Sequence, residues 1–250
     1  MAFQPIVDVA SRSVYAYEAL VRGLRGESAF SILSRVTGEN RYAFDQSCRV
    51  KAIELAARLG VADQGASLSV NFMPGAVYSP AACIQRTLKA ARDTGFPLDR
   101  LIFEITEDER VKDTAHLQAI VMEYRKHGFD MALDDFGAGY SGLNLLAELD
   151  VDVLKLDMRL LRNIDQRPRA VDIVDAAVAM CRSLNVRVVA EGIETIGEYA
   201  TVRNCGISLM QGYLFAKPMF EGLPAVAWPD SIYPAAIPTA PPVRLVQENL

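Results

Sequence analysis

The stretch MALDDFGAGYS, residues 131–141, shows how this chain is built. Met131, Ala132 and Leu133 have the apolar character of a buried strand, and Asp134 and Asp135 follow at once. The glycines that come next favour backbone conformations that continue neither a strand nor a helix, so the stretch predicts a sharp loop. Two adjacent carboxylates at the end of a buried strand are costly to desolvate and need a cation, a proton or a basic partner. An isolated Asp-Asp pair is more often a solvated turn that caps a helix, but other strands of this chain end in the same way.

Strand-like and helix-like segments alternate on both sides of this stretch. The predicted strands are residues 3–8, 14–22, 67–71, 101–105, 151–157, 186–190 and 208–212, the first two forming a hairpin. The predicted helices are residues 28–36, 42–59, 80–94, 114–127, 143–149, 168–184 and 195–204. This alternation is typical of parallel strands with crossover helices, and over this length it favours an α/β fold of the (β/α)8 TIM-like barrel type. A doubly wound open sheet is the alternative.

Composition sets the class of protein. The 250 residues suit one large domain better than two small ones, and 51% hydrophobic content is enough for a sizeable core. With a net charge of -5, the chain lacks the excess of basic residues that is typical of DNA-binding proteins. The four cysteines form no CxxC pair, which argues against a disulfide framework or a zinc site. The sequence shows neither a signal peptide nor a membrane span, so a cytoplasmic location is predicted.

The last thirty residues differ from the rest. Six of the chain's 12 prolines fall there, without periodicity. We therefore expect residues 1–220 to form the barrel and residues 221–250 to form a proline-rich C-terminal tail, either wrapped over the barrel or disordered.

Polar residues stand where the predicted strands end. They are Glu18, Asn71, Glu104, Asp134, Asp135, Lys155, Glu191 and Gln211. The carboxyl ends of parallel barrel strands converge on one face, where such barrels hold their active sites. A cluster of carboxylates with an amide oxygen suits Mg²⁺ or Mn²⁺, and Asp134 with Asp135 could bridge two ions. Two metal ions about 3.5–4 Å apart stabilise both the attacking and the leaving oxygen of a phosphodiester displacement.

Each of these residues also has a simpler interpretation. A single acid at a strand end is more often a helix cap or a surface charge, although a shared position at so many strand ends makes coincidence improbable. Lys155 could pair structurally with Asp157 or with an acid of the cluster. It could also form a Schiff base, as lysines at barrel strand ends do in aldolases. Neighbouring carboxylates favour its charged form, which suits the positioning of a water molecule better. Gln4 and Arg22 could be ordinary surface groups.

The same residues carry a family resemblance. YEALVR around Glu18, SVNFMP at Asn71, FEITE at residues 103–107, LDDFGAGYSGL, LKLD, VAEGIET and QGYLFAKP together resemble the EAL-domain cyclic-di-GMP-specific phosphodiesterases. The resemblance spans residues 3–219. It implies a barrel with one antiparallel strand, and hydrolysis of cyclic di-GMP to linear 5′-pGpG with two Mg²⁺ or Mn²⁺ ions in bacterial second-messenger signalling.

The resemblance also implies roles for single residues. Glu18, Asn71, Glu104 and Asp134 match the ligands of the first metal, and Asp134 and Asp135, with Glu191 nearby, match the second. Lys155 matches the residue that holds the attacking water. Glu107 matches the acid that fixes the loop after Asp135, and Gln211 matches a further site residue. Arg22 matches a phosphate contact and Gln4 a nucleotide contact.

The chain departs from the family pattern at Ala138 and Gly142, where relatives usually have threonine and serine. Both positions lie in the loop after Asp135. The family also implies a homodimer, and a sensor or GGDEF domain if the chain is an excised domain. A catalytically inactive cyclic-di-GMP-binding receptor is the alternative function, and a Schiff-base lyase acting through Lys155 is a second one.

Overall fold

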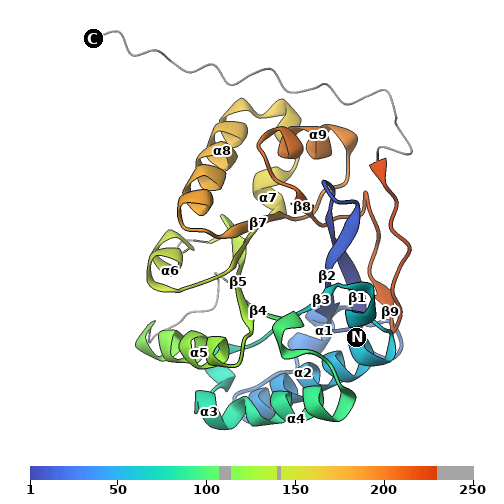
Figure 1. Cartoon of the computed structure of the whole chain (residues 1–250), viewed down its shortest axis with the longest axis vertical. Helices are drawn as coiled ribbons and strands as arrows, with labels where there is room; N and C mark the ends of the chain where they lie inside the picture. Colours follow the sequence, from blue (N-terminus) through green and yellow to red (C-terminus); the bar gives the residue numbers. More distant parts are fainter. Residues whose placement is uncertain (107–113, 140–141, 230–250) are drawn as a thin grey trace.

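The computed structural model describes residues 1–106, 114–139 and 142–229, and within them the strands form one sheet that closes on itself (Figure 1). The strands are β1 (Ala2–Asp8), β2 (Ser13–Leu20), β3 (Ser67–Asn71), β4 (Leu101–Thr106), β5 (Asp130–Phe136), β6 (Val153–Leu156), β7 (Arg187–Ala190), β8 (Leu209–Met210) and β9 (Met219–Phe220). Their order is β2-β3-β4-β5-β6-β7-β8-β1, and β1 pairs with β2 again. This closure confirms the barrel and excludes the open sheet.

One strand of the barrel runs against the others. The pairs from β2 to β8 are parallel, whereas β1 is antiparallel to both β2 and β8. The predicted opening hairpin accounts for this reversal, because β1 and β2 are joined by a short turn. β9 pairs with the other end of β1, at Ala2 and Phe3, so β1 is covered on one side by two short strands, β8 and β9.

The helices lie outside the barrel. They are α1 (Ala29–Leu33), α2 (Arg41–Arg58), α3 (Pro80–Cys83), α4 (Gln85–Thr94), α5 (Thr114–Lys126), α6 (Gly142–Glu148), α7 (Met158–Leu161), α8 (Pro168–Ser183) and α9 (Ile196–Asn204). A large apolar layer lies between them and the strands. A separate cluster fills the barrel itself, with one residue from each of seven strands, β1, β2 and β4 to β8: Ile6, Ala16, Ile102, Ala132, Val153, Val189 and Leu209.

Two predicted elements differ from the structure. Residues 80–94 form two helices that meet at Ile84. The backbone N–H of Ile84 donates to the carbonyl oxygen of Pro80, and that of Leu88 donates to the carbonyl oxygen of Ile84, so hydrogen bonding continues across the junction. The apolar spacing continues through Ile84, so the break is not marked in the sequence. The predicted strand 208–212 is reduced to Leu209–Met210, although the backbone N–H of Gln211 still donates to the carbonyl oxygen of Ala190 at the end of β7.

Cys83, Cys181 and Cys205 are buried, Cys48 is half-buried, and all four are free thiols. Among the described residues, none of the helices combines the length and the apolar character that a membrane crossing requires.

Candidate metal and catalytic site

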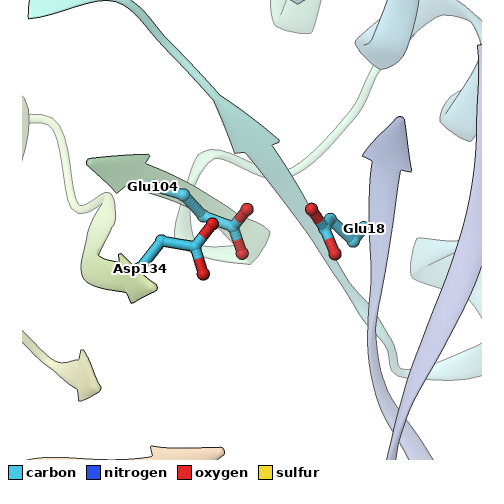
Figure 2. Close-up of side chains that lie close together, drawn as sticks. All are labelled: Glu18, Glu104 and Asp134. Atoms are coloured by element: carbon cyan, nitrogen blue, oxygen red, sulfur yellow. The ribbon is translucent and has the colours of Figure 1, made fainter. Parts of the chain in front are cut away.

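Three acids from different strands meet at the carboxyl ends of the parallel strands. Glu18 lies on β2, Glu104 on β4 and Asp134 on β5, and Figure 2 shows their carboxylates directed into the same space. Each can offer an oxygen within 4.8 Å of the others. Glu104 is fully buried, and Glu18 and Asp134 are nearly so. The prediction that strand-end acids converge is correct for these three.

Asp134 also belongs to a second group, with Asp135 and Glu191, whose oxygens likewise lie within 4.8 Å of one another. Successive strand residues normally point to opposite faces, so two adjacent aspartates at one site need an irregular backbone. The backbone supplies it: Asp135 has φ 57°, and the pairing of β5 with β6 shifts register between Leu133 and Phe136. The irregularity lets neighbouring carboxylates serve one site.

Lys155, on β6, lies in the middle of the acids. Its Nζ is 2.8 Å from Glu191, 2.9 Å from Glu104, 3.0 Å from Asp134 and 3.7 Å from Glu18. The side chain is 1% exposed. Burial lowers the pKa of Lys155, but the surrounding carboxylates outweigh burial and hold the pKa well above its ordinary value. The lysine is therefore a cation here, which opposes the imine chemistry of the Schiff-base alternative.

Two neutral amide side chains donate hydrogen bonds to the acids. The amide nitrogen of Asn71, at the end of β3, donates to Glu18 at 3.1 Å and to Glu104 at 2.9 Å. The amide nitrogen of Gln211 donates to the other oxygen of Glu18 at 2.9 Å. Asn71 presents its nitrogen to the acids, so it can offer oxygen to a cation only after its amide rotates by half a turn.

Ser69 is a site residue that the sequence analysis missed. Its hydroxyl donates to Glu104 at 2.6 Å, and the residue is 1% exposed. The alternation of strand side chains could have identified it, because Ser69 stands two residues before Asn71 and shares its face.

The acids outnumber the single ammonium, and four of them, Glu104, Asp134, Asp135 and Glu191, have raised pKa values with burial as the largest cause. Burial raises the pKa of Glu104 to about 8; Lys155 opposes this rise, while Glu18 and Asp134 add to it. Burial, followed by the charge of Asp134, raises the pKa of Asp135 to about 6. Burial also raises the pKa of Asp134 and Glu191 against the opposing charge of Lys155. Such a cluster of hard oxygen donors fits a divalent cation, which would relieve the excess negative charge.

Two predicted residues make their hydrogen bonds away from this cluster. Gln4 pairs with Glu18 in the register of β1 and β2, but its amide donates to the carbonyl oxygen of Ala216 at 3.1 Å. Arg22 donates to the carbonyl oxygen of Val21 at 2.7 Å. Glu107 lies outside the described residues, so its predicted role stays a prediction.

A cavity of about 950 Å³ adjoins the cluster at Asn71. Apolar side chains from β2, α1, α2 and the segment after β3 make up most of its lining, among them Leu20, Leu33, Phe44 and Phe72. Arg41 adds a positive charge. The site thus combines an acidic centre with an apolar space large enough for a drug-sized group.

Comparison with known proteins agrees with this architecture. Residues 1–218 match the family model described as "EAL domain". The chain is 30% identical over 92% of its length to the blue light- and temperature-regulated antirepressor BluF of Escherichia coli, of which it covers 56%. It is 30% identical over 98% of its length to the cyclic di-GMP phosphodiesterase NbdA of Pseudomonas aeruginosa, of which it covers 32%. The chain thus spans about a third to a little over half of these relatives.

Solved structures extend the comparison. A standalone versatile EAL protein from Vibrio cholerae O395, in its c-di-GMP-bound form, superposes with a TM-score of 0.88 at 50% identity, covering 92% of this chain and 96% of that one. The manganese and cy-diGMP complex of Klebsiella pneumoniae BlrP1 at pH 9.0 superposes with a TM-score of 0.85 at 33% identity, covering 91% of this chain and 57% of that one.

Proposed function

The chain belongs to the EAL domain family, and from that premise we propose that it is a phosphodiesterase that hydrolyses cyclic di-GMP to linear 5′-pGpG with two divalent ions, Mg²⁺ or Mn²⁺. The observation that carries the proposal is the complete set of strand-end acids around Lys155, at the face where such barrels hold their active sites. Relatives named cyclic di-GMP phosphodiesterases and neighbours solved with c-di-GMP support it. The protein would act in the cytoplasm.

Glu18, Asn71, Glu104 and Asp134 are the proposed holders of one ion, and Asp134, Asp135 and Glu191 of the other. The geometry supports this division, because the two groups of acids share Asp134. When bound, the ions would neutralise phosphate charge and make water a better nucleophile.

The proposed hydrolysis adds one water molecule to the substrate. The water oxygen bonds to phosphorus, the bond from phosphorus to one 3′-oxygen breaks, and that oxygen takes a proton. Lys155 would orient the attacking water with its ammonium group, since its Nζ reaches acids of both groups. Ser69, Asn71 and Gln211 hold Glu104 and Glu18 in place by hydrogen bonds.

The substrate would lie over the acids and extend into the apolar cavity beside Asn71. Arg22 lies two residues after the end of β2, and Gln4 lies within β1, paired with Glu18 in the strand register. We propose a phosphate contact for Arg22 and a nucleotide contact for Gln4. Glu107 keeps its proposed role in fixing the loop after Asp135.

A cyclic-di-GMP-binding receptor without catalytic activity is the second candidate. The observation that favours it is the name of one relative, BluF, which describes an antirepressor and not an enzyme. The presence of every acid and of Lys155 favours the enzyme.

The deciding experiment incubates the purified chain with cyclic di-GMP and Mg²⁺ or Mn²⁺, with and without EDTA, and separates the products. We expect metal-dependent pGpG from the wild type and none from Glu18→Ala. Tight binding of intact cyclic di-GMP without product would support the receptor. Wild-type turnover by Glu18→Ala would contradict the metal assignment.

Assembly is a further part of the proposal. We propose that residues 1–220 form the catalytic unit and that two copies form a homodimer through the helices beside the loop after Asp135. Exposed Met122 on α5 (64%) and Leu143 on α6 (63%) support this face. Because several relatives are much longer than this chain, a sensor or GGDEF domain is proposed as a partner in the same polypeptide. Sedimentation of wild type and Met122→Glu measures the association.

A further inference from the structure

A fully buried arginine lies on the outer side of the barrel, behind the acid cluster. Arg49, on α2, has no exposed side-chain surface. Its guanidinium is 2.6 Å from Asp45, one helical turn earlier, and donates to the hydroxyl of Tyr124 on α5 at 2.5 Å. A buried ion pair is expensive to desolvate and is often replaceable by apolar residues without loss of stability. Stability alone is therefore a weak explanation for Arg49.

The rings around Arg49 connect it to two proposed metal ligands. The guanidinium carbon lies 5.0 Å from the ring centroid of Phe72, 5.6 Å from Phe103 and 5.7 Å from Tyr124. Phe72 follows Asn71, and Phe103 precedes Glu104. Since neighbouring strand residues point to opposite faces, the rings pack outward on Arg49 while Asn71 and Glu104 point inward. The position of the guanidinium thereby constrains the ends of β3 and β4.

Asp45 holds the same region through the backbone. Its Oδ1 accepts the backbone N–H of Met73 at 2.9 Å, two residues after Asn71. The other oxygen of Asp45 faces Arg49. The ion pair thus contacts the two residues that follow Asn71, with Arg49 on the ring of Phe72 and Asp45 on the backbone N–H of Met73.

We propose that Arg49 and Asp45 are positioning residues that hold Asn71 and Glu104 in the geometry needed to bind a divalent ion. The inference rests on the proposed function, because it concerns the metal ligands named there. Outer partners of metal ligands typically change metal affinity by about 10–100-fold when removed.

The chain offers a matched control at the opposite end of the barrel. Arg125, on α5, pairs with Asp152 at 2.5 Å, and Asp152 accepts the backbone N–H of Met131 at 2.8 Å. Like the pair of Arg49 and Asp45, this pair holds a strand end through a backbone N–H, but Arg125 is 33% exposed and the strand end is the amino-terminal start of β5, away from the acids. If Arg49 had a purely structural role, replacing Arg49 and replacing Arg125 would change Mn²⁺ binding in the same way.

The test measures the Mn²⁺ dissociation constant by calorimetric titration without nucleotide, well below the melting temperature of each variant. We expect Arg49→Met to weaken Mn²⁺ binding about tenfold and Arg125→Met to leave it unchanged. Tyr124→Phe removes one hydrogen-bond partner of Arg49 at little cost in volume. It should weaken binding less, and it serves as the test if Arg49→Met does not fold.

The outcomes separate the two proposals. Unchanged Mn²⁺ affinity in folded Arg49→Met or Tyr124→Phe, with a lower melting temperature, would overturn the positioning role and leave the proposed function intact. Equal weakening in Arg125→Met would overturn it as well, because the effect would be general. If the wild type binds no Mn²⁺, the proposed function fails, and this inference fails with it.

Discussion

At the scale of single residues, the backbone conformation of Asp135 restricts which amino acids are stable at this position. Its φ of 57° lies in the left-handed region, which costs an ordinary residue about 1–2 kcal/mol and glycine almost nothing. We expect Asp135→Gly to be more stable than Asp135→Ala by about 1 kcal/mol, measured by urea unfolding in EDTA. Asp134, which is not among the residues with positive φ, is the control. There alanine should be the more stable substitution, and the same order at both positions would contradict the assigned backbone.

Lys155 provides the positive charge that the acids share in the absence of a metal ion. Its replacement by methionine leaves several buried carboxylates without a counter-charge, so we expect Lys155→Met to melt lower than the wild type in EDTA. Mn²⁺ should then raise the melting temperature of the variant more than that of the wild type. Turnover should fall by at least about 100-fold, as for loss of a general acid–base group. An equal Mn²⁺ shift in both proteins would contradict the counter-charge role.

The site residues that could be predicted are those placed by topology. Glu18, Glu104 and Asp134 end parallel strands, and a barrel brings such ends together. The shared direction of Asp134 and Asp135 could not be derived from strand alternation, because it depends on a local register shift. Arg49 was equally hidden, since an arginine in an amphipathic helix is normally a surface residue.

At the scale of elements, the start of α9 is held by one acid. Glu198 accepts backbone N–H groups of Asn163, Glu194 and Thr195, and Arg162 pairs with it at 3.3 Å. Thr195 completes a capping box with it. These contacts fix the segment between Glu191 and α9, and so the direction of Glu191.

The pKa of Glu198 gives this contact a pH signature. Burial opposes ionisation, but the backbone donors outweigh it and lower the pKa below its ordinary 4.5. A lowered native pKa means that the stabilisation is complete above about 4.5 and is lost as the pH falls through the native value. We expect Glu198→Gln to lose about 2 kcal/mol at pH 7, in line with hydrogen bonds to a charged group. The difference from wild type should shrink below pH 4.5 in urea unfolding; a constant difference would contradict the charge argument.

The elements themselves were predictable where a period or a cap marks them. Gly95, with φ 71°, closes α4, and Thr195 begins α9, as their sequence positions indicate. The break at Ile84 and the shortness of β8 were not predictable, because neither a change of period nor a capping residue marks them in the sequence.

At the scale of the whole molecule, metal binding should stabilise the fold. A ligand at about 100 times its dissociation constant adds about 2.7 kcal/mol to the free energy of unfolding. For a chain of this size, that corresponds to a rise of about 5–10 °C in melting temperature. We expect this rise with Mn²⁺ in scanning calorimetry, its reversal by EDTA, and a much smaller rise in Glu104→Gln. An equal rise in that variant would place the ion elsewhere.

The seam between β1 and β8 has a consequence for how the protein folds. It is a short pairing of Val7 with Met210 and Asp8 with Leu209, residues some two hundred positions apart in the chain, and the backbone N–H of Val9 adds a hydrogen bond to the carbonyl oxygen of Ser208. Contacts of such long sequence separation form late, because closing the loop between them costs the most entropy. The hydrogen bond from Gln211 to Glu18 spans the same seam. The acid cluster should therefore be the last part of the molecule to form, and during refolding the proposed phosphodiesterase activity should return after the sheet signal in circular dichroism.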